Sequence, residues 1–147
     1  MSNSINILNT LSDLLIRAKA KGADLVEINP ANEDFSQQQH HRIPPTIILD
    51  PTEDMQVMQE EIFGPVLPVI TWESQKEAVA IIVKNPYPLA LYIFSSKAKN
   101  IDWFIDNTQA GSTAINEVVI QVANSDLPFG GIQSSGMGRS GGQANFD

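Results

Sequence analysis

A regular alternation of apolar β-branched runs and amphipathic segments, between residues 65 and 116, most constrains the fold of this chain. The expected strands are 66–72, 89–94 and 112–116, and the expected helices are 74–84 and 97–108. Ser74 and Glu77 have the spacing of a capping box, which marks a helix start. This order is typical of parallel strands joined by right-handed crossovers. The sequence therefore predicts an α/β fold, with a mostly parallel sheet and flanking helices, in which these three strands share one sheet.

The flanking regions are less regular. Residues 4–21 predict an amphipathic helix, because apolar side chains recur at helical spacing at Leu8, Leu11, Leu15 and Ala18. Short strands are expected at 25–28 and 46–49, with a polar loop at 29–42 between them. Six of the nine glycines lie between Gly130 and Gly142, which indicates a shaped loop. We expect a single domain over 1–147, with parts at 1–64 (helix, strands and loop), 65–124 (the βαβαβ unit) and 125–147 (the glycine-rich tail).

Charge and composition exclude several classes of protein. The 147 residues include 9 lysines and arginines against 17 aspartates and glutamates, a formal charge of −8. Such a chain disfavours nucleic acid and anionic membrane surfaces as partners. No apolar run approaches the ~20 residues of a membrane span, and the first residues lack the pattern of a signal peptide. With no cysteine, the chain has no disulfide and no thiolate nucleophile. We expect a soluble cytoplasmic protein.

Two patterns are rejected as functional sites. Residues 136–141 spell G-x-G-x-x-G, but a dinucleotide fingerprint must follow a strand, open a helix and have an acidic residue ~20 positions later. This sequence ends six residues after Gly141. His40 and His41 are adjacent in a glutamine-rich loop, without the ligands from other elements that a metal site collects. We expect solvated histidines and no metal.

The stretch from Gln59 to Val69, QEEIFGPVLPV, is the most informative in the chain. In extended backbone Glu61 and Phe63 project on the same side, where a carboxylate and an aromatic ring can hold a ribose. Gly64 allows close approach of another backbone or a ligand, and Pro65 stiffens entry into the next strand. The alternative interpretation, a solvated acid beside a core aromatic, carries more weight on the residues alone.

Several blocks in order along the chain resemble the NAD(P)-dependent aldehyde dehydrogenase superfamily. The stretch above resembles its E-x-F-G-P motif. The other similar blocks are Pro44-Pro45-Thr46 with Leu49-Asp50, Ala110-Gly111 through Ile115-Asn116, Leu127 to Gly131, and Ser135 to Arg139. The sequence is most similar to the class-3-like branch that includes coniferyl aldehyde dehydrogenases. The resemblance covers nearly the whole chain, as the C-terminal part of a catalytic domain.

The resemblance implies roles for four residues. Glu61 and Phe63 would contact the nicotinamide ribose of NAD or NADP, and Asn116 and Phe129 would lie near the substrate entrance. The family oxidises aldehydes to carboxylic acids, with a cysteine nucleophile and a glutamate base that both lie upstream of the matched region. We therefore expect this chain to contribute no catalytic residue, to be inactive alone and to bind no cofactor alone.

Two other functions stay open. One is a non-catalytic α/β module that binds a partner protein through the sheet surface that a missing half would cover, and a weaker one is a residual nucleotide-binding module. The expected partners are a second copy of the chain or a complementing aldehyde dehydrogenase half, because uncovered apolar surface promotes association.

Overall fold

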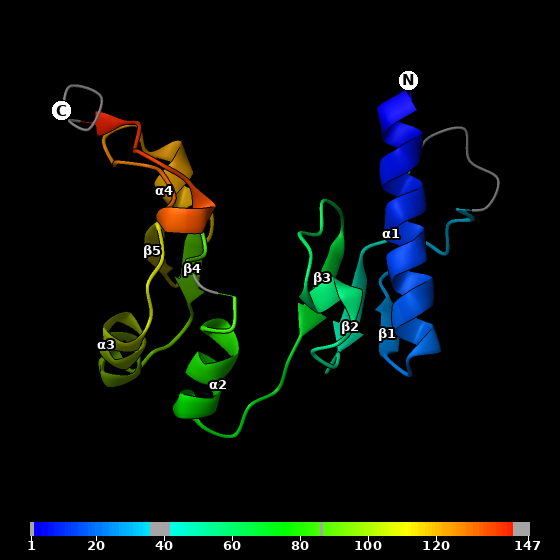
Figure 1. Cartoon of the computed structure of the whole chain (residues 1–147), viewed down its shortest axis with the longest axis horizontal. Coiled ribbons are helices and arrows are strands. Elements are labelled where there is room, and N and C mark those ends of the chain that lie inside the picture. The colour runs from blue at the N-terminus through cyan, green and yellow to red at the C-terminus, as the bar shows by residue number, and fades with distance from the viewer. Residues whose placement is uncertain (1, 36–41, 86, 143–147) are drawn as a thin grey trace. The chain divides into compact units, whose positions relative to one another are not determined.

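The computed structural model describes residues 2–35, 42–85 and 87–142. The chain divides into two compact units, Met1–Thr71 and Trp72–Asp147, whose α-helices and β-strands are labelled in Figure 1. Each unit is described by itself below. The prediction of a single domain, with parts bounded at 64/65 and 124/125, stays a prediction.

The first unit packs one helix against a three-stranded sheet. Its elements are α1 (Ser2–Ala20), β1 (Asp24–Glu27), β2 (Thr46–Leu49), the short 3-10 helix η1 (Gln56–Met58) and β3 (Val66–Val69). β1 pairs antiparallel with β2, placing Asp24 opposite Leu49. β2 pairs parallel with β3, placing Thr46 opposite Val66. The strand order is therefore β1-β2-β3, with β2 in the middle.

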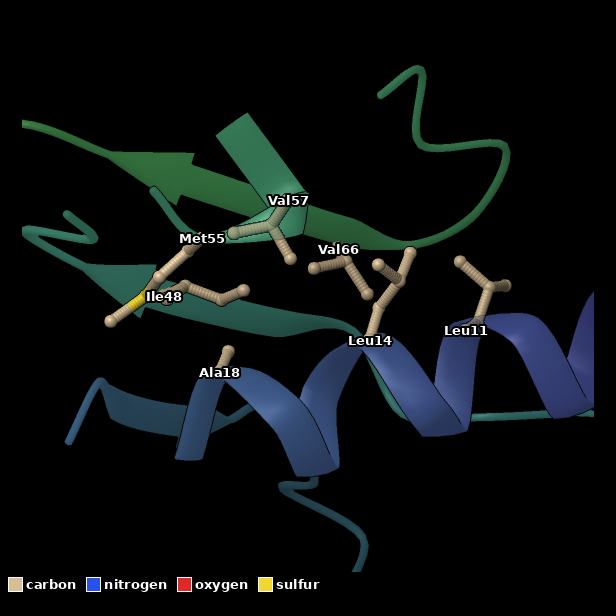
Figure 2. Close-up of a cluster of buried hydrophobic side chains, with 7 residues drawn as sticks. All are labelled: Leu11, Leu14, Ala18, Ile48, Met55, Val57 and Val66. Carbon is tan, nitrogen blue, oxygen red and sulfur yellow. The ribbon is translucent and has the colours of Figure 1, made fainter. Parts of the chain in front are cut away.

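The core of this unit follows from the helical spacing in the sequence. The buried side chains come from α1, the sheet and the segment around η1, and Figure 2 shows them facing one another: Leu11, Leu14, Ala18, Ile48, Met55, Val57 and Val66. Ile48, in the central strand, is completely buried. The predicted stripe on α1 is confirmed at Leu11 and Ala18, and Leu15 packs at its margin.

The second unit carries a parallel strand pair with helices before and between the strands. Its elements are α2 (Gln75–Ile82), β4 (Ala90–Ile93), α3 (Ala98–Asn107), β5 (Ser112–Ile115), α4 (Ile120–Ala123) and the 3-10 helix η2 (Gln133–Ser135). β4 and β5 pair in parallel, with Leu91 opposite Thr113. A β-α-β crossover therefore joins them, as the alternation predicted.

The capping box is half confirmed. Ser74 precedes α2 in an extended conformation, and its Oγ accepts a hydrogen bond from the Glu77 N–H at 3.3 Å. The Glu77 carboxylate accepts instead from the N–H of Glu73, one residue before the cap, at 2.8 Å. The helix starts where the sequence predicted, with the return bond displaced by one residue.

One prediction about strand pairing is wrong. The strands predicted near 66–72, 89–94 and 112–116 do not share one sheet among the described residues, because β3 pairs with β2 whereas β4 pairs only with β5. The crossover rule assigns consecutive strands to one sheet, but it cannot detect that β2 supplies the partner of β3. The α/β class is confirmed, and the parallel pairs outnumber the antiparallel one. The sequence interpretation also missed α4 and η2, which are too short to give a periodic signal.

None of the helices in the described part of the chain combines the length and the apolar composition of a membrane span. The same part of the chain contains no group of three His, Asp or Glu residues able to hold a metal ion. His40 and His41 lie outside it.

Candidate functional site

The loop entering β3 exposes the two residues that the sequence singled out in the first unit. Ile62 packs against the core cluster, whereas Glu61 on one side is exposed and Phe63 on the other is 75% exposed. The alternative interpretation, in which Phe63 belongs to the core, is therefore wrong within the first unit. The half-buried Ile62 anchors the loop, and an acid and an aromatic ring on either side of it are both available to solvent.

Gly64 follows this pair, and close packing against α1 explains why a residue without a side chain is needed there. A Cβ at this position would clash with Cδ1 of Leu11 and lie 3.0 Å from its Cδ2. The close neighbour is thus a helix side chain and not the backbone or ligand that the sequence suggested. The next residue joins the sheet, because the Thr46 N–H donates to the Pro65 carbonyl at 2.9 Å. The loop is fixed both to the helix and to β2.

Asp50 fixes the far ends of the strands that carry this loop. It follows β2 with a left-handed φ of 41°, and its Oδ1 accepts from the N–H (2.7 Å) and the Oγ1 (2.8 Å) of Thr71. These bonds, the backbone one foremost, hold the pKa of Asp50 below its usual value. Asp50 belongs to one of the blocks that carry the family resemblance, and the structure gives it a positioning role that the sequence did not reveal.

Asn116 lies directly after β5 in the second unit and clamps the chain that leaves β4. Its Oδ1 accepts from the Ser95 N–H at 2.8 Å, and its Nδ2 donates to the Ser95 carbonyl at 3.1 Å. Its backbone is left-handed, with φ 56°, a conformation that asparagine tolerates better than most residues. Ser95 in turn accepts from the Lys97 N–H through its Oγ at 3.1 Å. The side chain of Asn116 therefore holds the loop that leads into α3.

Phe129 begins a loop that is closed by glycine contacts. Its N–H donates to the Ser140 carbonyl (2.6 Å) and its carbonyl accepts from the Ser140 N–H (2.8 Å). A Cβ on Gly131 would lie 2.6 Å from the Gly136 nitrogen, so glycine is required for the turn to close. Phe129 and Arg139 help to line a cavity of about 370 Å³ within this loop.

Comparison with known proteins decides the family. The sequence model described as "Aldehyde dehydrogenase family" matches residues 3–147. The chain belongs to the aldehyde dehydrogenase family. It is 52% identical over 129 residues to a protein of Caulobacter vibrioides named probable coniferyl aldehyde dehydrogenase, a match that covers 88% of this chain and 27% of the relative. A protein of the same name from Pseudomonas aeruginosa is 40% identical over 139 residues, with 95% and 28% covered.

Solved structures agree with this assignment. A substrate-bound structure of Staphylococcus aureus AldH superposes with a TM-score of 0.80 at 37% identity, covering 97% of this chain and 29% of the other. A structure of an indole-3-acetaldehyde dehydrogenase complexed with NAD+ gives a TM-score of 0.82 at 30% identity, covering 97% and 28%. This aldehyde dehydrogenase chain therefore spans little more than a quarter of the length of such relatives.

The predicted site residues of this aldehyde dehydrogenase chain fall in different places. Glu61 and Phe63 lie together in the first unit, and Asn116 and Phe129 lie in the second. Asn116 follows the end of β5, whereas the loop that contains Phe129 lies near the start of β5. The contact that places this loop is between Gly111, just before β5, and Gly131: a Cβ on Gly111 would lie 3.0 Å from the Cα of Gly131. Gly111 and Asn116 are five residues apart, about 16 Å in extended backbone. The roles of these residues at a cofactor ribose and a substrate entrance stay predictions.

A larger hollow lies apart from these residues. It has a volume of about 640 Å³ and is lined at the C-terminal ends of α2 and α3, by residues that include Val83, Tyr87 and Asp106. Tyr87 has a left-handed φ of 63°. The sequence interpretation did not identify this hollow, because its two sides come from segments that are 17 or more positions apart in the chain.

Proposed function

We propose that this chain supplies the ribose-binding end of the NAD(P) site, and part of the substrate entrance, of an enzyme that oxidises aldehydes to carboxylic acids. The observation that carries the proposal is the loop around the half-buried Ile62, which presents Glu61 and Phe63, two positions apart in the sequence, to solvent. The 52% identity to a protein named probable coniferyl aldehyde dehydrogenase supports coniferyl-type aldehydes as the substrate class.

Glu61 and Phe63 fit one end of a dinucleotide. A carboxylate can accept hydrogen bonds from the two ribose hydroxyls, and an exposed ring can cover the apolar face of the sugar. Within the described residues the ion pairs join Lys21 to Asp54 and Arg42 to Glu33, so no lysine or arginine there pairs with the Glu61 carboxylate. When bound, the cofactor accepts hydride from the substrate. The part assigned to this chain is to hold and orient the ribose beside that chemistry.

The sequence holds no cysteine, and the family reaction needs a thiolate nucleophile. The second part of the proposal is therefore that the chain is inactive by itself and acts only with a polypeptide that supplies the nucleophile. Charge-assisted hydrogen bonds between the Glu61 carboxylate and the ribose would contribute ~1.5–3 kcal/mol to the free energy of binding. That is less than the ~4.1 kcal/mol that corresponds to millimolar affinity.

Calorimetry and complementation test the two parts separately. The chain alone is expected to show no NAD binding tighter than about millimolar and no NADH production with any aldehyde. Mixed with the Caulobacter vibrioides relative truncated to remove the matched segment, it is expected to restore NADH production. Glu61→Ala and Phe63→Ala should each raise the KM for NAD in the mixture, whereas Glu60→Ala, at an exposed neighbouring carboxylate, should not.

Two results would overturn the proposal. Micromolar NAD binding by the chain alone, lost in Glu61→Ala, would show that the cofactor site is complete without a partner. A restored activity that Glu61→Ala and Phe63→Ala leave unchanged would remove both residues from the cofactor site.

A second candidate is a non-catalytic interaction module. It is favoured by an exposed apolar segment around α4, where more than half of the surface of each of four side chains is accessible: Val118, Val119, Ile120 and Val122. Val119 also has a left-handed φ of 65°, which is a genuine outlier for a β-branched residue. Failure of the complementation experiment, with a stable complex nevertheless formed, would support this candidate.

A further inference from the structure

The hollow at the C-terminal ends of α2 and α3 has the size and the walls of a site for a small molecule. Its volume of about 640 Å³ lies within the range of known ligand pockets. Val83, directly after α2, is 53% exposed, and Ile105, near the end of α3, is 46% exposed. Both line the hollow, together with the half-buried Ile82 and Pro88. A ligand with an apolar body would therefore cover side chains that solvent now reaches.

The charge of this hollow is negative. Among the described residues that line it, Asp106 alone carries a charge, and the others are apolar, aromatic or uncharged polar residues. Asp106 is exposed, and neither ion pair in the described part of the chain involves it. A positively charged ligand would therefore meet a carboxylate that pairs with no lysine or arginine there.

The ends of the two helices add to this negative charge. α2 and α3 both end at the hollow, and a helix carries the equivalent of about half a negative elementary charge at its C-terminus. Cations are stabilising there, yet neither helix has a basic residue in its last turn. Asp106 instead places an acid in the last turn of α3, which disfavours the helix. A bound cation would compensate for the carboxylate and for both helix ends.

Tyr87 contributes an aromatic ring from a strained position. Its φ of 63° is left-handed, which is an outlier for a bulky residue. Strain of this kind concentrates at binding and active sites. The half-buried side chain lines the hollow, and aromatic rings attract organic cations. The ring therefore favours the same class of ligand as the carboxylate.

We propose that this hollow binds a small organic cation with an apolar body, such as an aromatic amidine, guanidine or amine. The cationic group lies at Asp106 and the helix ends, and the apolar body lies against Val83 and Ile105. None of the residues predicted to contact the cofactor or the substrate entrance lines the hollow. The site is therefore a separate one, and it holds whether or not the chain takes part in aldehyde oxidation.

Benzamidine is a suitable probe, because it joins an aromatic body to a positive charge. Titrated into the intact, isotope-labelled chain, it is expected to shift the amide resonances of Val83, Ile105 and Asp106 with one saturable Kd in the millimolar range or below. Benzamide is neutral and has nearly the same shape, so it should bind at least about tenfold more weakly. Benzoate, which is an anion, should not bind detectably.

Substitutions separate the roles of the charge and of the apolar wall. Asp106→Asn keeps the shape of the side chain and should weaken benzamidine binding at least about tenfold. Asp106→Lys should abolish binding and raise the Tm, because a cation suits the end of α3. Val83→Ser, which changes only the wall, should weaken binding about threefold. These side chains are exposed, so the circular dichroism spectra should match that of the unsubstituted chain.

Glu117→Gln is the matched control. It removes an exposed carboxylate that follows β5, whereas Gln109 of the hollow precedes β5, so its Kd for benzamidine should be unchanged. Absence of saturable benzamidine binding, equal binding of benzamide, or a Kd that both Asp106 variants leave unchanged would overturn the proposal. A Kd that Glu117→Gln raises as much as Asp106→Asn would also overturn it, because that result would show a general attraction to the net charge of −8.

Discussion

The two units of the chain are built on different kinds of contact. The first has a cluster of seven buried apolar side chains, centred on the fully buried Ile48. The described part of the second buries only Ala78, Ile93 and Ala114 among its apolar side chains, and its helix α3 buries none. The second unit also contains the hydrogen bonds from the Asn116 side chain to the Ser95 backbone, and glycines packed closely against backbone. The difference predicts that removing an apolar side chain costs more stability in the first unit than in the second.

The largest expected effect is on the core of the first unit. Ile48→Ala removes a fully buried side chain and should lower the free energy of unfolding by about 2–5 kcal/mol. The matched change Ile105→Ala, on α3 where the side chain is 46% exposed, should cost under about 1 kcal/mol. Urea unfolding followed by circular dichroism reports on both units, and tryptophan fluorescence reports on the second, because Trp72 and Trp103 both lie there. Equal losses would remove the contrast between the units.

The loss of stability caused by a glycine-to-alanine substitution should depend on which atoms the new Cβ meets. In Gly131→Ala it meets the backbone of Ser135 and Gly136, which cannot move aside, so we expect a loss of about 3 kcal/mol. In Gly64→Ala it meets the flexible end of Leu11, and the expected loss is nearer ~1 kcal/mol. Adding Leu11→Ala to Gly64→Ala should cost less than the sum of the single changes. Thermal unfolding would measure all four variants, and strict additivity would argue against the contact.

The clamp at the end of β5 should have a smaller effect. Asn116→Ala removes two hydrogen bonds to Ser95 and should cost about 1–2 kcal/mol. The Ser95 amide should then exchange its hydrogen faster. Asn116→Gly loses the same bonds but relieves the left-handed backbone, so it should cost less than the alanine change. If Ser95 keeps its protection in both variants, Asn116 does not position this loop.

The smallest effect concerns acid stability of the first unit. Hydrogen bonds from Thr71 lower the folded-state pKa of Asp50, and bonds from Lys21 and then Thr52 lower the pKa of Asp54. A lowered folded pKa gives a stability contribution that is present above the unfolded value of ~3.9. That contribution is lost as pH falls through the folded pKa. In the Asp50→Asn variant the urea midpoint should therefore fall less steeply than in the unsubstituted chain as the pH is lowered from about 5 to about 2. The difference should be small, because Asp50 is exposed to solvent.

Thr71→Val is a graded control for Asp50. It removes the hydroxyl bond and keeps the stronger backbone N–H bond, so its pH profile should lie between those of the unsubstituted chain and Asp50→Asn. A profile for Asp50→Asn that matches the unsubstituted chain would show that these bonds do not stabilise the folded state.

The sequence by itself determined the elements and the family. Helical spacing of Leu11 and Ala18 located α1, the Ser74 cap located the start of α2, and the β-branched runs located the strands within a few residues. These signals are local, because periodicity and capping are properties of adjacent residues. The ordered family motifs, from the E-I-F-G-P stretch to the final glycine block, identified the aldehyde dehydrogenase family, which the comparisons confirmed.

Only the tertiary structure decided which strands pair and what each motif residue touches. β2 and not β4 is the partner of β3, Gly64 makes room for Leu11, and Asn116 holds Ser95. Each of these contacts joins residues 20 or more positions apart, and a single sequence contains no signal for the partner across such a distance. The strand pattern specifies which side chains need burial, but the packing of the whole unit selects the surface that buries them.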